Sequence, residues 1–203
     1  MMSTLECLSC GFKTINFEKF GDLSLDLTRQ SSSTRFVTRI KLKLEDIISS
    51  YFNKEIISDY NCMNCRRRVD IEKKDEIIKY PNILIINIKR FEFYPFAKKL
   101  DNKVMIKEEI DLKDYFVNKN CDKSASAQKF IKKERDKGKY VLRSFIEHSG
   151  KINFGHYISY CYSKEEEGWL IFNDTRVTNL YKSDFIENKE SGAYVLFYER
   201  LSD

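Results

Sequence analysis

Both histidines of the chain, His148 and His156, lie in one segment that also holds possible partners for a catalytic base. Imidazole titrates near neutral pH, so hydrolases commonly use histidine to accept a proton. A catalytic histidine also needs a group that holds its tautomer, and Asn173 or Asp174 could serve because both follow a nearby apolar run. Residues 140–174 therefore predict a general base with an orienting partner.

Four of the six cysteines form two C-x-x-C pairs, Cys7 with Cys10 and Cys62 with Cys65. Two cysteines at this spacing in a tight turn can both face one tetrahedral zinc ion, and Gly11 permits such a turn after the first pair. Because residues 11–61 separate the pairs, a shared ion would join two distant hairpins at the tip of an extended ribbon. We expect one structural zinc ion on all four thiols; four unrelated free thiols are the alternative.

The two remaining cysteines carry no such signal. Cys121 lies in a polar stretch without a nearby base in sequence, and Cys161 follows the segment around His156, where packing is the simplest interpretation. The N-terminus has neither the basic region nor the apolar region of a secretory signal, so a reducing compartment and metal binding are expected rather than disulfides.

Strand-like runs must position the candidate site. The 27 Tyr and Phe residues and only 2 Pro favour a β-rich body. Residues 83–88 are a nearly continuous β-branched run, which predicts a central strand buried on both faces. Residues 192–199 predict a second central strand. Apolar spacing predicts a helix over residues 42–51, and Ser183 could cap a short helix over residues 182–187.

The net charge of +5 lies in one stretch, residues 118–139, which holds eight Lys or Arg and three acidic residues. A charge confined in this way is typical of a solvated loop, with a nucleic-acid patch as the alternative. No apolar run approaches the about 18–20 residues of a membrane helix. We therefore expect no membrane partner and no nucleic acid, and a cytoplasmic or nuclear location.

Several motifs occur together, in an order and at a spacing that are specific in combination. They are Cys7-x-x-Cys10 with Phe20-x-Asp22-Leu23-Ser24-Leu25, Tyr60-x-Cys62-x-x-Cys65, Pro81-x-Ile83-Leu84-Ile85, Ile88-Lys89-Arg90-Phe91, Tyr140-x-Leu142, His148-Ser149-Gly150, Gly155-His156-Tyr157-x-Ser159-Tyr160, Trp169-x-x-Phe172-Asn173-Asp174 and Ala193-Tyr194-Val195-Leu196-Phe197-Tyr198. Over most of its length the chain resembles the ubiquitin-specific proteases, a family of cysteine deubiquitinases.

The resemblance implies an α+β fold of the papain-like cysteine protease superfamily, shaped like a hand. Zinc-ribbon fingers would occupy about residues 5–80, interleaved with a β-rich palm over residues 81–117 and 140–203, and residues 118–139 would be a charged insert loop.

The resemblance also assigns roles to residues of the site. His156 would be the base and Asn173 its orienting residue, with Asp174 supplying charge or ordering the polar network. Gly155, Tyr157 and Trp169 would lie along the channel for the Gly-Gly end of the substrate; core packing is the alternative for the two aromatic residues. His148 would be structural, with its ring held by hydrogen bonds.

In the family, the nucleophilic cysteine and the thumb precede the first C-x-x-C pair, which here lies close to Met1. We therefore expect the nucleophile to be absent and the chain to be inactive by itself. The full enzyme would cleave the peptide or isopeptide bond after the C-terminal glycine of ubiquitin, so ubiquitin or ubiquitinated proteins are the expected partners. A catalytically inactive ubiquitin-binding zinc module and a zinc-ribbon nucleic-acid binder are the alternatives.

Overall fold

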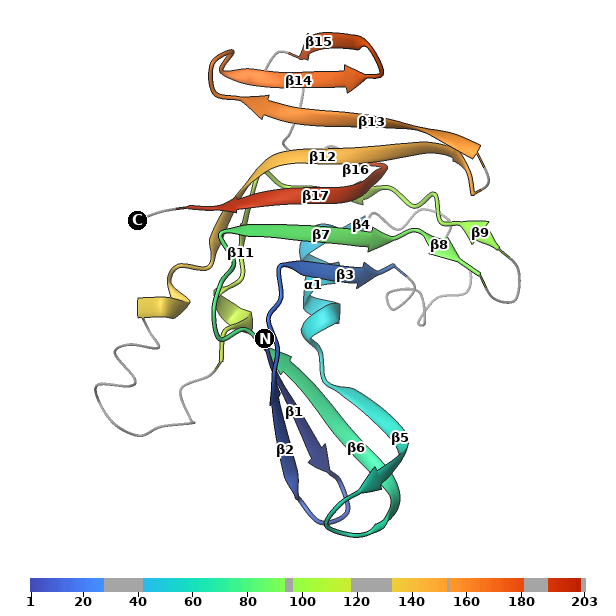
Figure 1. The fold of residues 1–203 in the computed structure, drawn as a ribbon, viewed down its shortest axis with the longest axis vertical. Helices are drawn as coiled ribbons and strands as arrows, with labels where there is room; N and C mark the ends of the chain where they lie inside the picture. Colours follow the sequence, from blue (N-terminus) through green and yellow to red (C-terminus); the bar gives the residue numbers. More distant parts are fainter. Residues whose placement is uncertain (28–41, 94–96, 118–132, 153, 181–189, 202–203) are drawn as a thin grey trace.

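The computed structural model describes residues 1–27, 42–93, 97–117, 133–152, 154–180 and 190–201. Most of its strands belong to two sheets, a large one and a four-stranded one that projects from it (Figure 1). The predicted helix over residues 182–187, most of the predicted charged loop, and Cys121 lie outside the described residues. Within the described part of the chain, no helix is long and apolar enough to cross a bilayer.

The large sheet has eight strands and carries the histidine segment. Its order is β15-β14-β13-β12-β17-β7-β3, with β11 paired to β12. The strands are β3 (Asp22–Asp26), β7 (Ile83–Lys89), β11 (Glu109–Asp111), β12 (Lys139–Lys151), β13 (Phe154–Ser163), β14 (Gly168–Asn173), β15 (Arg176–Leu180) and β17 (Ala193–Arg200). β17 lies between β12 and β7, which confirms the predicted central strand near the C-terminus.

The four-stranded sheet is a long antiparallel ribbon, drawn at the lower end of Figure 1. It contains β1 (Met2–Cys7), β2 (Lys13–Phe17), β5 (Glu55–Cys62) and β6 (Arg67–Glu76), in the order β2-β1-β6-β5. β1–β2 and β5–β6 are two hairpins whose central strands pair with each other. The two C-x-x-C turns therefore meet at the tip of the ribbon, as the sequence predicts.

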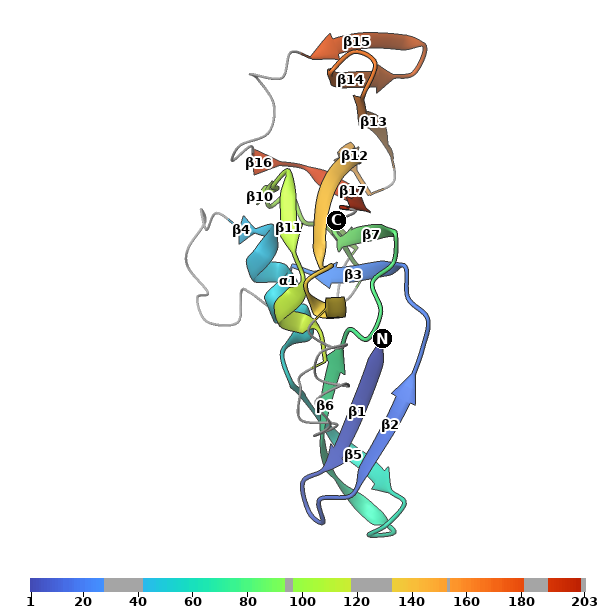
Figure 2. The same cartoon turned by 90° about the vertical axis from the view of Figure 1, so that its left-hand side faces the viewer.

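Helix α1 (Leu44–Phe52) supports one face of the large sheet and starts two residues later than predicted. Leu44, Ile47, Ile48 and Phe52 are buried at the helical spacing that the sequence indicates. The shorter elements are β4 (Leu42–Lys43), β8 (Phe91–Glu92), β9 (Lys98–Lys99), β10 (Val104–Met105), the 3-10 helix η2 (Lys113–Tyr115) and β16 (Glu190–Ser191). In Figure 2, α1, β4 and β10 lie on the same side of the large sheet.

The prediction that residues 83–88 are buried on both faces is wrong. Leu84, Ile86 and Ile88 are fully buried, but Ile83 is 50% exposed and Ile85 is only partly buried. Neighbouring residues of a strand point to opposite faces, and among the described residues the helix and short strands cover only one of them (Figure 2). The run therefore builds a core on one side, whereas its other side carries Ile83, Ile85 and Asn87 and is partly exposed.

Candidate functional site

His156 and Asn173 lie on neighbouring strands and touch. Ser159 of β13 pairs with Phe172 of β14, and this register places His156 and Asn173 on one face as diagonal neighbours. The imidazole Nε2 lies 2.5 Å from Asn173 Oδ1. An amide oxygen only accepts hydrogen bonds, so Nε2 carries the proton and donates it. The other ring nitrogen, Nδ1, is left with its lone pair and can act as the base.

Asp174 lies beside this pair in the turn between β14 and β15. It is exposed and has a left-handed backbone conformation with φ 52, which aspartate adopts more readily than most residues. The residues on either side of this turn, Asn173 and Arg176, pair with each other. Because the contact with the imidazole comes from Asn173, the geometry favours Asn173 as the residue that orients the ring.

Gly155 precedes the base, and close contacts within the chain explain why this position has no side chain. A Cβ atom at this position would lie 2.0 Å from His148 Nε2 and 2.5 Å from Ser149 O. The His148 ring therefore occupies the space that any other residue at 155 would need. The expected role, close passage of a substrate backbone, is not required to explain this glycine.

His148 is buried, and aromatic rings surround it. Its ring centroid lies 4.6 Å from that of Tyr157 and 5.7 Å from that of Phe91. The expectation that hydrogen bonds hold the ring is wrong for Nδ1, which is buried without a partner among the described residues. Burial lowers the pKa of His148, and the positive charge of Lys99 lowers it further while Asp101 opposes this effect. These two groups belong to the segment that includes β9.

Tyr157 is exposed, whereas Trp169 is not. Tyr157 is 54% exposed on the strand that carries the base, so it remains a candidate for substrate contact. Trp169 is 1% exposed and packs against Phe145 and Tyr162, which favours the core alternative for this residue.

Sequence reasoning missed two aromatic residues of this region: Tyr194, a neighbour of Tyr157, and Phe91, a neighbour of Tyr194 and His148. The ring of Tyr194 lies 6.4 Å from that of Tyr157 and 5.7 Å from that of Phe91. Phe91 lies two residues after the end of β7, and Tyr194 is the second residue of β17. An aromatic side chain beside or within an apolar strand is most simply interpreted as part of the core.

Replacing Gly155 with alanine is expected to destabilise the protein by about 2 kcal/mol, the typical cost of overpacking, because the new methyl group must displace the His148 ring. Urea unfolding followed by tyrosine and tryptophan fluorescence measures this free energy. Gly21→Ala is the matched control, since a Cβ there meets no atom within 4 Å. Equal midpoints for the two variants would contradict the crowding at Gly155.

The four paired cysteines form the second candidate site, at the tip of the ribbon. All four Sγ atoms lie within 4.8 Å of one another. Cys7 Sγ lies 3.8 Å from Cys65 Sγ, and Cys10 Sγ lies 3.9 Å from Cys62 Sγ. Four sulfur atoms at the usual Zn–S bond length of about 2.3 Å form a tetrahedron with edges of about 3.8 Å. These residues therefore fit a tetrahedral metal ion and are too far apart for disulfides.

The two cysteine turns share one backbone pattern. Gly11 N donates to Cys7 O and Arg66 N donates to Cys62 O, both at 2.8 Å. Gly11 has φ 70 and Arg66 has φ 55, so each turn ends in a left-handed residue. Glycine signals such a turn in the sequence, but arginine does not, and only the structure shows that the second turn matches the first.

The fifth described cysteine, Cys161, is far from the base. It follows His156 by five positions on β13, which separates them by about 17 Å along the strand and places them on opposite faces. The cysteine cluster lies at the other end of the molecule, at the tip of the ribbon (Figure 1). Among the described residues, no thiol is therefore in reach of His156.

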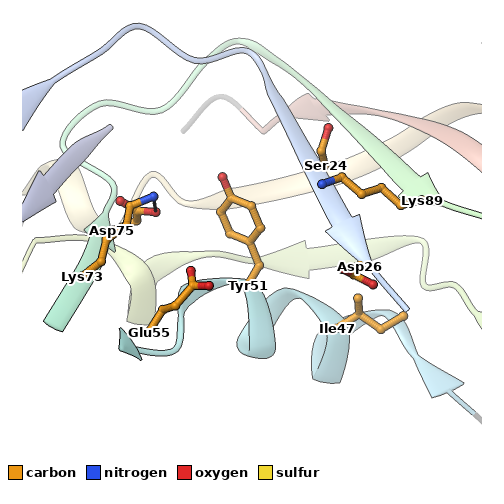
Figure 3. A pocket seen from close by; sticks show the side chains of 8 residues that line it. All are labelled: Ser24, Asp26, Ile47, Tyr51, Glu55, Lys73, Asp75 and Lys89. Carbon is orange, nitrogen blue, oxygen red and sulfur yellow. Dashed lines mark ion pairs between the residues drawn. The ribbon is translucent and has the colours of Figure 1, made fainter. Parts of the chain in front are cut away.

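A polar hollow of about 130 Å³ lies where the ribbon meets the large sheet. It is lined by Ser24, Asp26, Ile47, Tyr51, Glu55, Lys73, Asp75 and Lys89. Figure 3 shows the Tyr51 ring rising from α1 between the side chains of β6 and those of β3 and β7. Lys73 and Asp75 form an ion pair at 3.1 Å. The hollow contains neither candidate site, and its charges are of both signs.

Comparison with known proteins identifies relatives over nearly the whole chain. The sequence model of the family described as ubiquitin carboxyl-terminal hydrolase matches residues 1–198. Ubiquitin carboxyl-terminal hydrolase 2 of Gallus gallus is 32% identical over 208 residues, covering 100% of this chain and 51% of the relative. Ubiquitin carboxyl-terminal hydrolase 8 of Saccharomyces cerevisiae is 30% identical, covering 97% of this chain and 38% of the relative. The chain thus spans about half of the first relative's length and less than half of the second's.

Solved structures show the same similarity. A SAGA DUB module that contains Ubp8 and is bound to monoubiquitin has a chain that superposes with a TM-score of 0.74 at 27% identity. A related module with Ubp8 bound to ubiquitin aldehyde gives a TM-score of 0.73 at 28% identity. Each match covers 99% of this chain and 40% of the other.

Proposed function

The chain belongs to the ubiquitin carboxyl-terminal hydrolase family, and we propose that it carries the histidine half of a deubiquitinase active site. The reaction is hydrolysis of the peptide or isopeptide bond after the C-terminal glycine of ubiquitin by a cysteine thiolate. The observation that carries this proposal is the contact between His156 Nε2 and Asn173 Oδ1. It leaves Nδ1 free to accept the thiol proton.

In the proposed mechanism, His156 Nδ1 takes the proton from the thiol, and the thiolate attacks the carbonyl carbon of the ubiquitin C-terminal glycine. The C–N bond breaks, and the imidazolium returns its proton to the leaving amine. Water then hydrolyses the thioester, with His156 accepting a proton from the water. Asn173 keeps Nε2 protonated throughout. Its amide is neutral, so it contributes orientation and not charge.

The thiol for this reaction comes, in our proposal, from outside the described residues. Two observations support this: Cys161 lies about 17 Å along the strand from His156, and the other four described cysteines gather at the tip of the ribbon. The relatives and structural neighbours are about two to three times as long as the region that matches this chain. The chain would therefore act as part of a larger enzyme.

We assign the ribbon to the zinc-binding fingers and the large sheet to the palm of a papain-like hand. Cys7, Cys10, Cys62 and Cys65 would hold one zinc ion, which would supply structural cross-linking of the two hairpins. No step of hydrolysis involves this site, because it lies at the end of the molecule remote from β13, the strand that carries His156 (Figure 1).

Gly155 and Tyr157 would line the path of the ubiquitin tail toward His156, with Phe91 and Tyr194 as further members of this wall. The exposed ring of Tyr157, its contact with Tyr194 and the contact of Tyr194 with Phe91 support the assignment. Trp169 is left out because its side chain is buried.

Asn173→Ala is expected to lower kcat about a hundredfold in the enzyme that contains this chain and its nucleophile, since a misplaced catalytic group costs about that factor. Turnover of a fluorogenic C-terminal amide of ubiquitin measures the effect. Asn173→Asp should retain most activity, because a carboxylate oxygen also accepts from Nε2. Asp174→Ala is the matched control, and a loss equal to that of Asn173→Ala would refute the assignment of the orienting residue.

A non-catalytic ubiquitin-binding module is the second candidate function, favoured by the lack of a thiol near His156 in the described part of the chain. An ubiquitin probe with an electrophilic C-terminus separates the two functions. The proposed enzyme, with its nucleophile present, forms a covalent adduct and turns over ubiquitin amides. A binding module holds ubiquitin reversibly, and replacement of His156 then has no catalytic consequence.

A further inference from the structure

Lys99 is largely buried and connects the two-stranded sheet of β8 and β9 to the β12–β13 hairpin, which carries the base. Lys99 Nζ donates to His148 O at 2.8 Å and to Gly150 O at 3.1 Å. The side chain is only 10% exposed, and its ammonium also lies 3.3 Å from the Asp101 carboxylate. An ammonium group has three donors, and these three acceptors match that number. Charged donors form stronger hydrogen bonds than neutral ones.

The two carbonyl groups belong to residues that determine where His156 lies. His148 pairs with Tyr157, Ser149 with His156 and Gly150 with Gly155 in the β12–β13 hairpin. The His148 ring also covers the Cα of Gly155, the residue before the base. Lys99 thus holds the β12 carbonyls on both sides of Ser149, the partner of His156. A shift of either carbonyl would be transmitted through one pair of the ladder to the imidazole.

The segment that carries Lys99 is itself held firmly. Arg90 is 1% exposed, and its Nη1 donates to Leu100 O at 3.1 Å and to Asn102 O at 2.5 Å, while its Nε donates to Ala193 O at 2.6 Å. Leu100 N donates back to Arg90 O at 2.7 Å. Residues on the C-terminal side of Lys99 are therefore tied to the end of β7 and the start of β17, both inside the large sheet.

We propose that Lys99 is a positioning residue for the base: it holds the β12–β13 hairpin against the sheet so that His156 stays against Asn173. The contribution of Lys99 to catalysis rests on the proposed function, whereas its effect on the position of the imidazole does not. Lys99 touches neither reacting atoms nor His156 in this arrangement. It acts through the backbone of His148 and Gly150.

The test uses the fact that the chain contains only two histidines, so its imidazole NMR signals are few and can be assigned with His156→Ala. The readout is the exchange rate of the His156 Nε2–H proton with water. Lys99→Met keeps the length of the side chain and removes the donors. We expect about tenfold faster exchange or more, the factor that corresponds to losing a charged hydrogen bond. Asn173→Ala gives the reference for a fully released ring.

Lys98→Met is the matched control, because Lys98 is the neighbouring residue of β9 and pairs with Glu92 at the surface. It should leave the exchange rate unchanged, and Lys99→Arg should restore most of the protection. Equal rates for Lys99→Met and Lys98→Met would overturn the proposal. If Lys99→Met fails to fold, Lys99→Arg provides the test instead. Exchange of the His156 Nε2–H proton in Lys99→Arg as fast as in Asn173→Ala would overturn the proposal. Failure of the enzyme that contains this chain and its nucleophile to hydrolyse ubiquitin amides would refute the proposed function without changing these rates.

Discussion

His156→Ala is expected to lower kcat/KM for ubiquitin C-terminal amides by about a thousandfold or more in the enzyme that contains this chain, because the thiol loses the group that accepts its proton. Asn173 cannot replace the imidazole, since its amide is not basic near neutral pH. Turnover of a fluorogenic ubiquitin amide, with circular dichroism to verify folding, measures this loss.

Cys161→Ser on the same strand is the control for the His156 experiment. The structure places Cys161 about 17 Å along β13 from the base and on the opposite face, so this variant should retain activity. Substantial turnover by the His156→Ala variant would refute the assignment of His156 as the base. An inactive Cys161→Ser variant would instead indicate that Cys161 is the nucleophile, which would contradict its position in the sheet.

Cys62→Ser is expected to abolish zinc binding and to destabilise the ribbon sheet. Structural zinc contributes on the order of 10 kcal/mol to the folding of small zinc-binding domains. The ribbon leaves Ile15, Phe17 and Ile56 more than half exposed, so apolar burial does little to replace a cross-link at its tip. We expect the melting temperature to fall by about ten degrees or more. Metal analysis by mass spectrometry and thermal unfolding measure both effects.

Cys161→Ser again serves as the control, because this cysteine lies outside the cluster and should leave about one zinc ion per chain. The same experiment tests whether the two sites are independent. Loss of zinc should increase amide exchange in the ribbon and leave the His156 Nε2–H signal in place. A folded ribbon with no bound metal in the wild-type protein would contradict the zinc assignment.

Periodicity was sufficient to predict some individual elements. The helix near residue 44 and the central strand at β17 appear where apolar spacing indicates them. Local patterns are reliable here because each element buries one face, and its own sequence records that face. The wrong prediction of burial at β7 has the same origin. A β-branched run indicates strand propensity, but it does not indicate whether a second layer covers the other face of the strand.

For several residues of the site, the role of the side chain is determined by neighbours that are far away in the sequence. The glycine at 155 is explained by the ring of His148, and the burial of Trp169 by Phe145 and Tyr162. An aromatic residue beside a histidine motif fits a channel and a core equally well in one sequence. Packing decides between the two, because it depends on which strands become neighbours.

The sequence by itself determined the chemistry that is available: two cysteine pairs that fit zinc, a histidine that can accept a proton, and polar residues that can orient it. Ligand types and their local spacing are properties of the chain, so they can be read without coordinates. Only the tertiary structure decided that Asn173, and not Asp174, contacts His156, and that Lys99 holds the hairpin behind it. These contacts depend on strand register and on the docking of β9, which short-range sequence does not encode.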